Sequence, residues 1–235
     1  MLYDCLVIGG GAAGLAAAAF LGREATRQEV KKRILVLEKG TRVGKKLLAT
    51  GNGTCNLTNV HASPDHYHGD KAVASAVLKA LTIPQTMDFF TAIGVDLSIR
   101  EDGKVYPRSE QAGAVLDALR LEAAAHGVEV HCDSPAQSLR RQGDTWAVSV
   151  GEETLCAKQV LVTVGGAAAP SLGGSAEGYR LLTALGYDKT PLFPSIVQLR
   201  TATEFVRAVK GIRVDAKVSL TLKTCTDESS ENISE

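Results

Sequence analysis

With 235 residues, the chain is long enough to bury one large hydrophobic core or two modest ones. Hydrophobic residues make up 45% of the sequence and charged residues 22%, which is ordinary for a globular protein. The 26 basic and 26 acidic side chains cancel, which argues against nucleic acid or an anionic membrane as a partner.

Five cysteines, at positions 5, 55, 132, 156 and 225, are widely scattered and form no C-x-x-C pair. This usage is typical of a reducing cytoplasm rather than of a disulfide framework, so we expect a cytoplasmic protein. The start, MLYDCLVIGG, has no basic region before its apolar run and predicts a first strand, not a signal peptide. No apolar stretch reaches the roughly 18 residues of a membrane-spanning helix.

The run YDCLVIGGGAAG, from Tyr3 to Gly14, predicts a strand that turns into an alanine-rich helix. Its glycines form G-x-G-x-x-G in the strand-to-helix context that dinucleotide binding requires. Gly9 permits the tight turn, Gly11 lets the backbone approach a pyrophosphate, and Gly14 lets helix and strand pack closely. The free N–H groups and dipole of the helix then favour the phosphates.

A second predicted strand, residues 33–37, ends in Glu38. A carboxylate at this place can accept the hydroxyls of an adenosine ribose, and it would repel a 2′-phosphate. Glu38 lies further from the glycines than the usual interval of about 20 residues. We attribute the excess to the charged stretch 23–32, which lengthens the helix or the loop that leaves it.

Residues 39–59, KGTRVGKKLLATGNGTCNLTN, combine four cations with a small, polar loop that has too few apolar residues to be core. The backbone amides of residues 50–53 can form an anion-binding nest, and Lys45 or Lys46 can reach a phosphate. A solvated basic loop is the alternative. Cys55 has neither a C-x-x-C partner nor an obvious base, so we expect a packed neighbour of the cofactor, not a nucleophile.

The next stretch contains three histidines, His61, His66 and His68. Proline and aspartate interrupt them and no companion ligand follows at zinc-like spacing, so we expect a surface loop and no metal. Apolar spacing predicts helices over residues 71–81 and 84–93. A small hairpin over residues 95–106 follows, ending in YPRS. Tyr106 and Arg108 there either approach the substrate or form a rigid turn with a solvated arginine.

Ser109 is placed to cap a helix over residues 110–126 that ends at Gly127. A strand over 128–132 and alternating segments near 138, 146–150 and 154–156 predict a small antiparallel excursion. The run VLVTVGG, residues 160–166, predicts a buried parallel strand that stops against a ligand at Gly165. A glycine-rich connection then leads into a helix from about Ala176, and its N-terminus either faces the ligand or belongs to a simple loop.

From residue 191 the composition changes to short strands, among them an alternating one over residues 212–222. The end, TCTDESSENISE, is acidic and polar and predicts disorder. We therefore expect an incomplete dinucleotide-binding domain over residues 1–190, the start of a β-rich substrate domain over 191–223 and a disordered tail over 224–235. The fold class is α/β, with a Rossmann-like parallel sheet.

Five stretches carry a resemblance to a known family: GGGAAG, the acid that closes the second strand, GKKLLATGNGTCNLTN, EDGKVYPRS and VTVGGAAAPSLGGSAEGYRLLTALGY. In this order they resemble the BaiN-like/aminoacetone-oxidase family of FAD flavoproteins over about residues 3–220. The family usually has arginine at the position of Thr54 and threonine at that of Val164. Its members are considerably longer, so the chain looks truncated at its C-terminus.

The resemblance implies FAD in a glutathione-reductase-type architecture. It places residues 46, 50–52 and 56 under the pyrophosphate, ribityl chain and flavin, and the backbone near Ala136 against the adenine. The predicted cofactor-binding residues are Gly9, Gly11, Ala12, Ala13, Gly14, Glu38, Lys39, Lys45, Lys46, Thr50, Gly51, Asn52, Asn56, Ala136 and Gly165. No catalytic acid or base is predicted.

The sequence therefore predicts an FAD-dependent oxidoreductase that uses flavin hydride transfer on a small organic substrate, with NAD(P)H as a possible reductant. An NAD-dependent dehydrogenase is one alternative, because the glycine fingerprint and Glu38 also fit NAD. A truncated, non-catalytic dinucleotide-binding module is the other, because the chain lacks the family's late glycine-rich segment.

Overall fold

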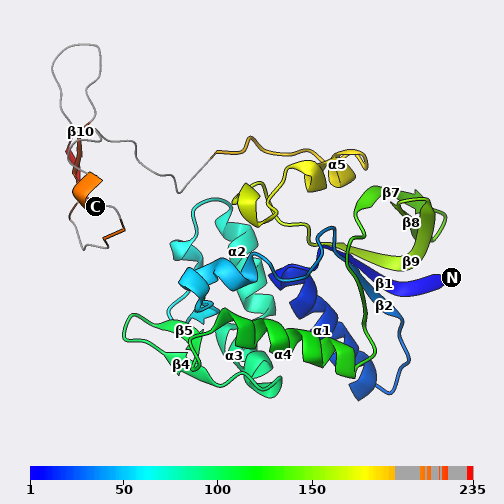
Figure 1. Ribbon diagram of the computed structural model, residues 1–235, viewed down its shortest axis with the longest axis horizontal. Coiled ribbons are helices and arrows are strands. Elements are labelled where there is room, and N and C mark those ends of the chain that lie inside the picture. The colour runs from blue at the N-terminus through cyan, green and yellow to red at the C-terminus, as the bar shows by residue number, and fades with distance from the viewer. Residues whose placement is uncertain (194–206, 210, 213–216, 218, 222–231, 235) are drawn as a thin grey trace, which may run out of the picture. The chain divides into compact units, whose positions relative to one another are not determined.

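The computed structural model describes residues 1–193, 207–209, 211–212, 217, 219–221 and 232–234. The chain divides into two compact units, Met1–Pro191 and Leu192–Glu235. Nearly all of the described structure belongs to the first unit (Figure 1). The domain boundaries that we expect at residues 190 and 223 remain predictions.

The first unit is built on a six-stranded sheet with the strand order β6-β2-β1-β9-β8-β7. Its centre is β1 (Leu2–Ile8), which pairs in parallel with β2 (Ile34–Leu37) and with β9 (Glu153–Val162). On the far side of β2, β6 (Glu129–His131) continues the parallel order. The predicted Rossmann-like α/β fold is confirmed, with the first strand, the acid-terminated second strand and the third strand in place.

The predicted antiparallel excursion is also present. β7 (Ala136–Gln142) and β8 (Thr145–Val150) form a hairpin, and β8 pairs antiparallel with β9. The prediction of separate strands at 154–156 and 160–166 is wrong, because β9 is continuous and Leu161 is 39% exposed. The polar residues Lys158 and Gln159 resemble a loop in sequence, but they lie within the strand with their side chains exposed.

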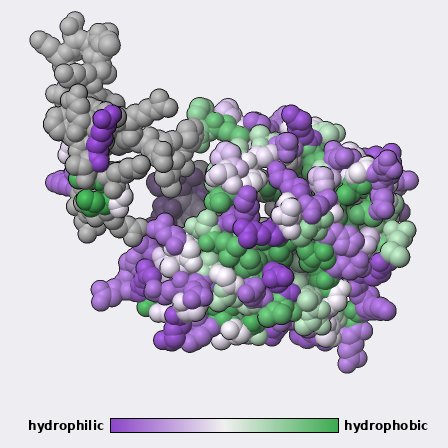
Figure 2. Space-filling view, in the orientation of Figure 1, coloured by the Kyte–Doolittle hydropathy of each residue, from purple (hydrophilic) through white to green (hydrophobic). Residues whose placement is uncertain are grey.

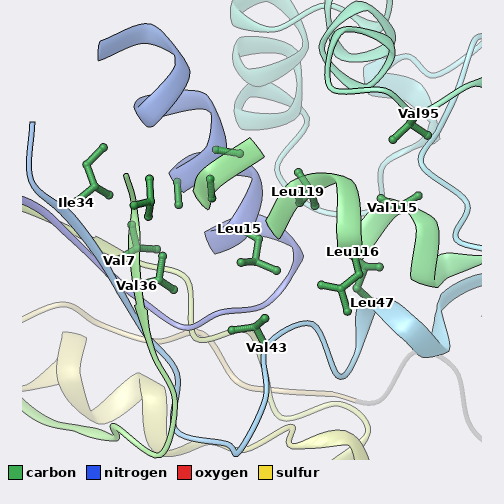
Figure 3. Packing of buried hydrophobic residues seen from close by; sticks show 14 of the residues in the cluster. Val7, Leu15, Ile34, Val36, Val43, Leu47, Val95, Val115, Leu116 and Leu119 are labelled. Atoms are coloured by element: carbon green, nitrogen blue, oxygen red, sulfur yellow. The ribbon is translucent and has the colours of Figure 1, made fainter. Parts of the chain in front are cut away.

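One face of the sheet is covered by α1 (Ala12–Arg27) and α4 (Ala112–Ala125). Successive strand residues point to opposite faces, so alternate residues of β1 and β2 join this cluster. Figure 3 shows side chains from these strands and helices meeting around Leu15, with Val43, Leu116 and Leu119 nearby. Tyr3, Leu6 and Ile8 of β1 join a second cluster, together with Leu35 and Leu37 of β2 and with the β7–β8 hairpin.

The helix α4 begins later than the sequence predicts. Its N-cap is Gln111, with no side-chain cap, and not Ser109. The backbone explains the difference, because Glu110 has a φ of 51° and cannot continue a right-handed helix back to Ser109. The end of α4 before Gly127 agrees with the prediction.

The stretch of chain between β2 and α4 forms short helices and a second, smaller sheet. It holds the short helices η1 (Leu47–Gly53) and η2 (Pro64–His66), then α2 (Lys71–Ala80) and α3 (Ile83–Ala92). The predicted hairpin is β4 (Leu97–Ile99) and β5 (Lys104–Pro107), and a short β3 (Thr58–Asn59), which was not predicted, completes a three-stranded sheet. Apolar and polar residues alternate in patches on the face shown in Figure 2.

After β9 the first unit ends with η3 (Pro170–Leu172) and α5 (Glu177–Thr183). In the second unit, η4 (Arg207–Val209) is followed by β10 (Ser219–Thr221) and β11 (Asn232–Ser234), which pair antiparallel. β11 falls within the predicted tail, and most of the predicted strand over 212–222 lies outside the described residues. Among the helices described, none combines the length and apolar character needed to span a membrane.

Candidate functional site: a crevice at the carboxyl edge of the sheet

A crevice of about 880 Å³ opens where β1, β2 and β9 end. In an open parallel sheet, ligands bind at this edge, outside the carboxyl ends of the strands. The volume is within the usual range of cofactor sites. Ten of the predicted site residues line it: Gly9, Gly11, Ala12, Ala13, Glu38, Lys39, Lys45, Lys46, Ala136 and Gly165.

The glycines of the first turn serve different physical needs. Gly9 has a φ of 108°, and a Cβ there would lie 2.6 Å from the carbonyl oxygen of Thr163. A Cβ on Gly14 would collide with the Gly9 carbonyl and lie 2.7 Å from the Thr163 hydroxyl. Both positions therefore exclude side chains because of the protein's own packing.

Gly11 is different, because an added Cβ would meet no protein atom within 4 Å. It lines the crevice at the N-cap of α1, with an ordinary φ of −79°. Neither backbone conformation nor internal packing therefore requires glycine there. A ligand that lies directly against the backbone does give a reason for it.

The Glu38 side chain is hydrogen-bonded to the backbone of the glycine turn. Its Oε2 accepts a hydrogen bond from the backbone N–H of Gly10 at 2.9 Å, and its Oε1 accepts one from that of Gly40 at 2.7 Å. An ionised carboxylate has about four lone-pair sites, so two remain for a ligand. The carboxylate is thus held in place by the protein and still lines the crevice.

The sequence did not predict the roles of two residues, Gly10 in this turn and Thr163 after β9. A Cβ on Gly10 would lie 2.5 Å from Val43 Cγ1 and 3.2 Å from Glu38 Oε2, so this glycine lets both side chains pack against the turn. The Thr163 hydroxyl donates to the carbonyl oxygens of Ile8 and Gly9, at 3.1 and 2.9 Å. The run of three consecutive glycines was the available signal for Gly10, whereas nothing in the sequence pairs Thr163 with β1.

The basic residues around the crevice are held in different ways. The ammonium of Lys46 donates to the carbonyl oxygens of Gly166 and Ala168, both at 3.2 Å. Lys39 pairs with Glu177 of α5, with 3.5 Å between Nζ and Oε2. Lys45 lines the crevice and is exposed. The pairing of Lys39 with Glu177 was not predicted.

The remaining predicted site residues lie outside the crevice lining. Gly14 lies behind it, and Thr50, Gly51, Asn52 and Asn56 belong to η1 and the segment after it. Gly51 and Asn52 are both left-handed, with φ of 56° and 55°. The anion-binding nest expected over residues 50–53 therefore remains a prediction. The roles of these residues toward FAD remain predictions.

Cys55 is 4% exposed, and burial raises the pKa of its thiol. A raised pKa keeps the thiol protonated at neutral pH, and the thiolate is the nucleophilic form. This agrees with a packed residue and not with a reactive one. The other described cysteines, Cys5, Cys132 and Cys156, are free.

The contacts of Arg108 at the end of the hairpin are those of a surface turn, and its role toward a substrate remains a prediction. Its guanidinium pairs with Asp96 at 2.6 Å on the surface, and both side chains are largely exposed. The Tyr106 ring is buried, and the guanidinium of Arg100 lies 3.9 Å from its centroid. His66 contacts Ser63 in the cap of η2. Within the described part of the chain, no three His, Cys, Asp or Glu residues gather as a metal site.

Comparison with known families matches residues 3–226 to the "HI0933-like protein Rossmann domain". Among curated proteins, the chain is 35% identical over 217 residues to the 3-dehydro-bile acid delta(4,6)-reductase of Clostridium scindens, covering 92% of this chain and 52% of that protein. It is 27% identical over 223 residues to the ribosomal RNA dihydrouridine synthase of Haemophilus influenzae, covering 91% and 53%. The chain thus spans about half the length of these relatives.

Among solved structures, the 3-ketosteroid-Δ4-(5α)-dehydrogenase of Rhodococcus jostii aligns with a TM-score of 0.56 at 16% identity, covering 80% of this chain and 54% of that one. A flavocytochrome c3 fumarate reductase aligns with a TM-score of 0.53 at 14% identity, covering 78% and 40%. At these identities the likeness concerns the fold alone. The family match carries the assignment, and the chain belongs to the HI0933-like Rossmann-domain family of FAD-binding oxidoreductases.

Proposed function

We propose that the chain forms the FAD-binding part of an oxidoreductase that transfers a hydride between the flavin and a small organic substrate. The observation that carries the proposal is the crevice itself, in which the glycine turn, the Glu38 carboxylate and the start of β7 face one space. When bound, FAD supplies the hydride chemistry, and the protein binds and orients it.

The turn is suited to the pyrophosphate of the cofactor. The N–H groups at the start of α1 have no partner within the helix, and the helix dipole adds positive potential there. Gly11 leaves the approach open. Lys45 and Lys46 line the same crevice and add positive charge to it.

Glu38 is suited to the ribose. Its two backbone donors fix the carboxylate, and its remaining lone pairs can accept both ribose hydroxyls. A phosphate on the 2′ oxygen would be repelled by this charge. The backbone from Ser134 to Ala136 lines the crevice next to Glu38, where the adenine ring would lie.

The names of two relatives favour the reductive direction. One is called a delta(4,6)-reductase and the other a dihydrouridine synthase, and each name describes the saturation of a carbon–carbon double bond. We infer the same class of reaction for the whole protein, with NAD(P)H as the source of the hydride. The balanced charge of this chain favours a small molecule over RNA, since phosphate recognition relies on excess cations.

The direct test is to purify the chain, record its absorbance, denature it and identify any released cofactor by mass. We expect a yellow protein that releases FAD. A colourless protein that binds NAD tightly would support the dehydrogenase alternative instead. If FAD is bound but neither NADH nor NADPH reduces it, the chain acts alone only as a dinucleotide-binding module.

A further inference from the structure

The segment after β9, up to and including α5, lines the crevice and contacts the rest of the first unit at three places. Lys46 donates to the carbonyl oxygens of Gly166 and Ala168, as described above. At its far end Leu181 is 6% exposed and belongs to the second core cluster. Between these anchors, Lys39 and Glu177, 138 residues apart in sequence, pair at the lining of the crevice.

We propose that Lys39 and Glu177 form a salt-sensitive latch that holds the N-terminal end of α5 across the crevice and slows the release of the bound dinucleotide. The inference rests on the proposed function, because the crevice is taken to be the FAD site. It adds a role for Glu177, which the family resemblance did not assign.

The carboxylate of Glu177 is bound by Ser175 as well as by Lys39. Its Oε2 accepts a hydrogen bond from the Ser175 hydroxyl at 3.1 Å, while the Ser175 oxygen accepts one from the Glu177 backbone N–H at 3.0 Å. The hydrogen bond from the Ser175 hydroxyl, followed by the interaction with Lys39, lowers the pKa of Glu177. The carboxylate is therefore ionised at neutral pH and faces the lysine.

We expect the segment to move about the residues that flank η3. Ala169 and Gly173 both have left-handed backbone, with φ of 53° and 87°, and they flank η3 between the Lys46 anchor and Glu177. The next residue, Gly178, is packed directly against Val164. Opening the latch would therefore free η3 and the chain up to Glu177, while Gly178 and Leu181 keep the rest of α5 in place.

The latch is weak, as a reversible closure requires. The side chains of Lys39 and Glu177 are 45% and 71% exposed, so water and salt screen the pair. Exposed pairs of this kind change an equilibrium by about two- to fivefold. That is enough to alter the residence time of a ligand without blocking its access.

The test compares Glu177→Gln with the parent chain by the rate at which bound FAD is released, followed by flavin fluorescence at low and high salt. We expect release about two- to fivefold faster in the variant at low salt. This difference should vanish near 1 M salt, where the Debye length falls to about 3 Å. The matched control is Glu152→Gln, on the exposed turn between β8 and β9, which should behave like the parent.

Two outcomes would overturn the latch. Equal or slower release by Glu177→Gln would show that the carboxylate does not hold the segment closed. A difference that persists at high salt would instead show direct contact between Glu177 and FAD. A second measurement needs no cofactor: hydrogen exchange of the backbone amides from η3 to Glu177 should be faster in the Glu177→Gln variant than in the parent. If the chain binds no FAD, the proposed function fails, while unchanged exchange rejects the latch separately.

Discussion

Three glycines that one sequence pattern treats alike are required for three different reasons. Gly9 is needed for its backbone conformation, Gly14 for helix-to-strand packing and Gly11 for open space at the crevice. The pattern predicted all three, because each reason favours the same residue. It did not predict Gly10, where a Cβ would lie 2.5 Å from the Val43 side chain and 3.2 Å from that of Glu38, both distant in sequence.

The packing role of Gly14 makes Gly14→Ala destabilising. Its Cβ would meet backbone and the Thr163 hydroxyl, so the turn must shift, at a cost of about 1–3 kcal/mol. Gly113 in α4 is the matched control, since a Cβ there meets nothing within 4 Å. Gly113→Ala should stabilise the helix by about 0.5–1 kcal/mol. Urea unfolding measures the free energy of unfolding of both variants, which should fall for Gly14→Ala and rise for Gly113→Ala. An unchanged free energy for Gly14→Ala would contradict the packing role.

Secondary structure was predictable where local patterns determine it and not where distant contacts do. The β4–β5 hairpin and the end of α4 follow from turn residues and glycines close in sequence. The continuity of β9 depends on pairing with both β1 and β8, which residues 153–162 do not reveal. Likewise, the start of α4 depends on the backbone at Glu110.

The exposed start of α4 gives a stability prediction. Gln111 has the extended backbone of an N-cap but caps no N–H group with its side chain. Gln111→Asp should supply that bond and favour the helix dipole, stabilising the chain by about 1 kcal/mol. Gln111→Ala is the control and should give no gain. Equal melting temperatures for the two variants would show that the N-cap is already satisfied.

Asp4 connects the strands of the sheet. Its Oδ2 accepts the backbone N–H of Arg33 at 2.9 Å, and its Oδ1 accepts the ammonium of Lys158 at 2.8 Å. The hydrogen bond from Lys158, followed by that from Arg33, lowers the pKa of the carboxyl. A lowered pKa in the folded state means that the stabilisation is present above the ordinary value of 3.8 and is lost as pH falls through the folded pKa.

Asp4→Asn should therefore cost about 0.5–1.5 kcal/mol of unfolding free energy at pH 7. The cost should shrink as the pH is lowered from about 5 toward 3, because the parent then becomes protonated as well. Urea unfolding at several pH values measures this, with Glu152→Gln as an exposed control. A difference that stays constant over this range would show that the charge of Asp4 contributes nothing.

At the scale of the molecule, the place of the site follows from the sheet. Three parallel strands end at one edge, and the turn after β1, the acid after β2 and the glycines after β9 meet there. The sequence predicted this meeting because the edge of a parallel sheet is a fixed consequence of strand order. It could not predict the Lys39–Glu177 contact, which depends on how the segment after β9 crosses the crevice.

The most direct test of the central claim is the FAD affinity of Gly11→Ala, measured by titration together with its melting temperature. Because the new Cβ meets no protein atom but lies where the pyrophosphate approaches, we predict an unchanged melting temperature and FAD binding weaker by about tenfold or more. FAD binding equal to that of the parent would contradict a pyrophosphate at this turn.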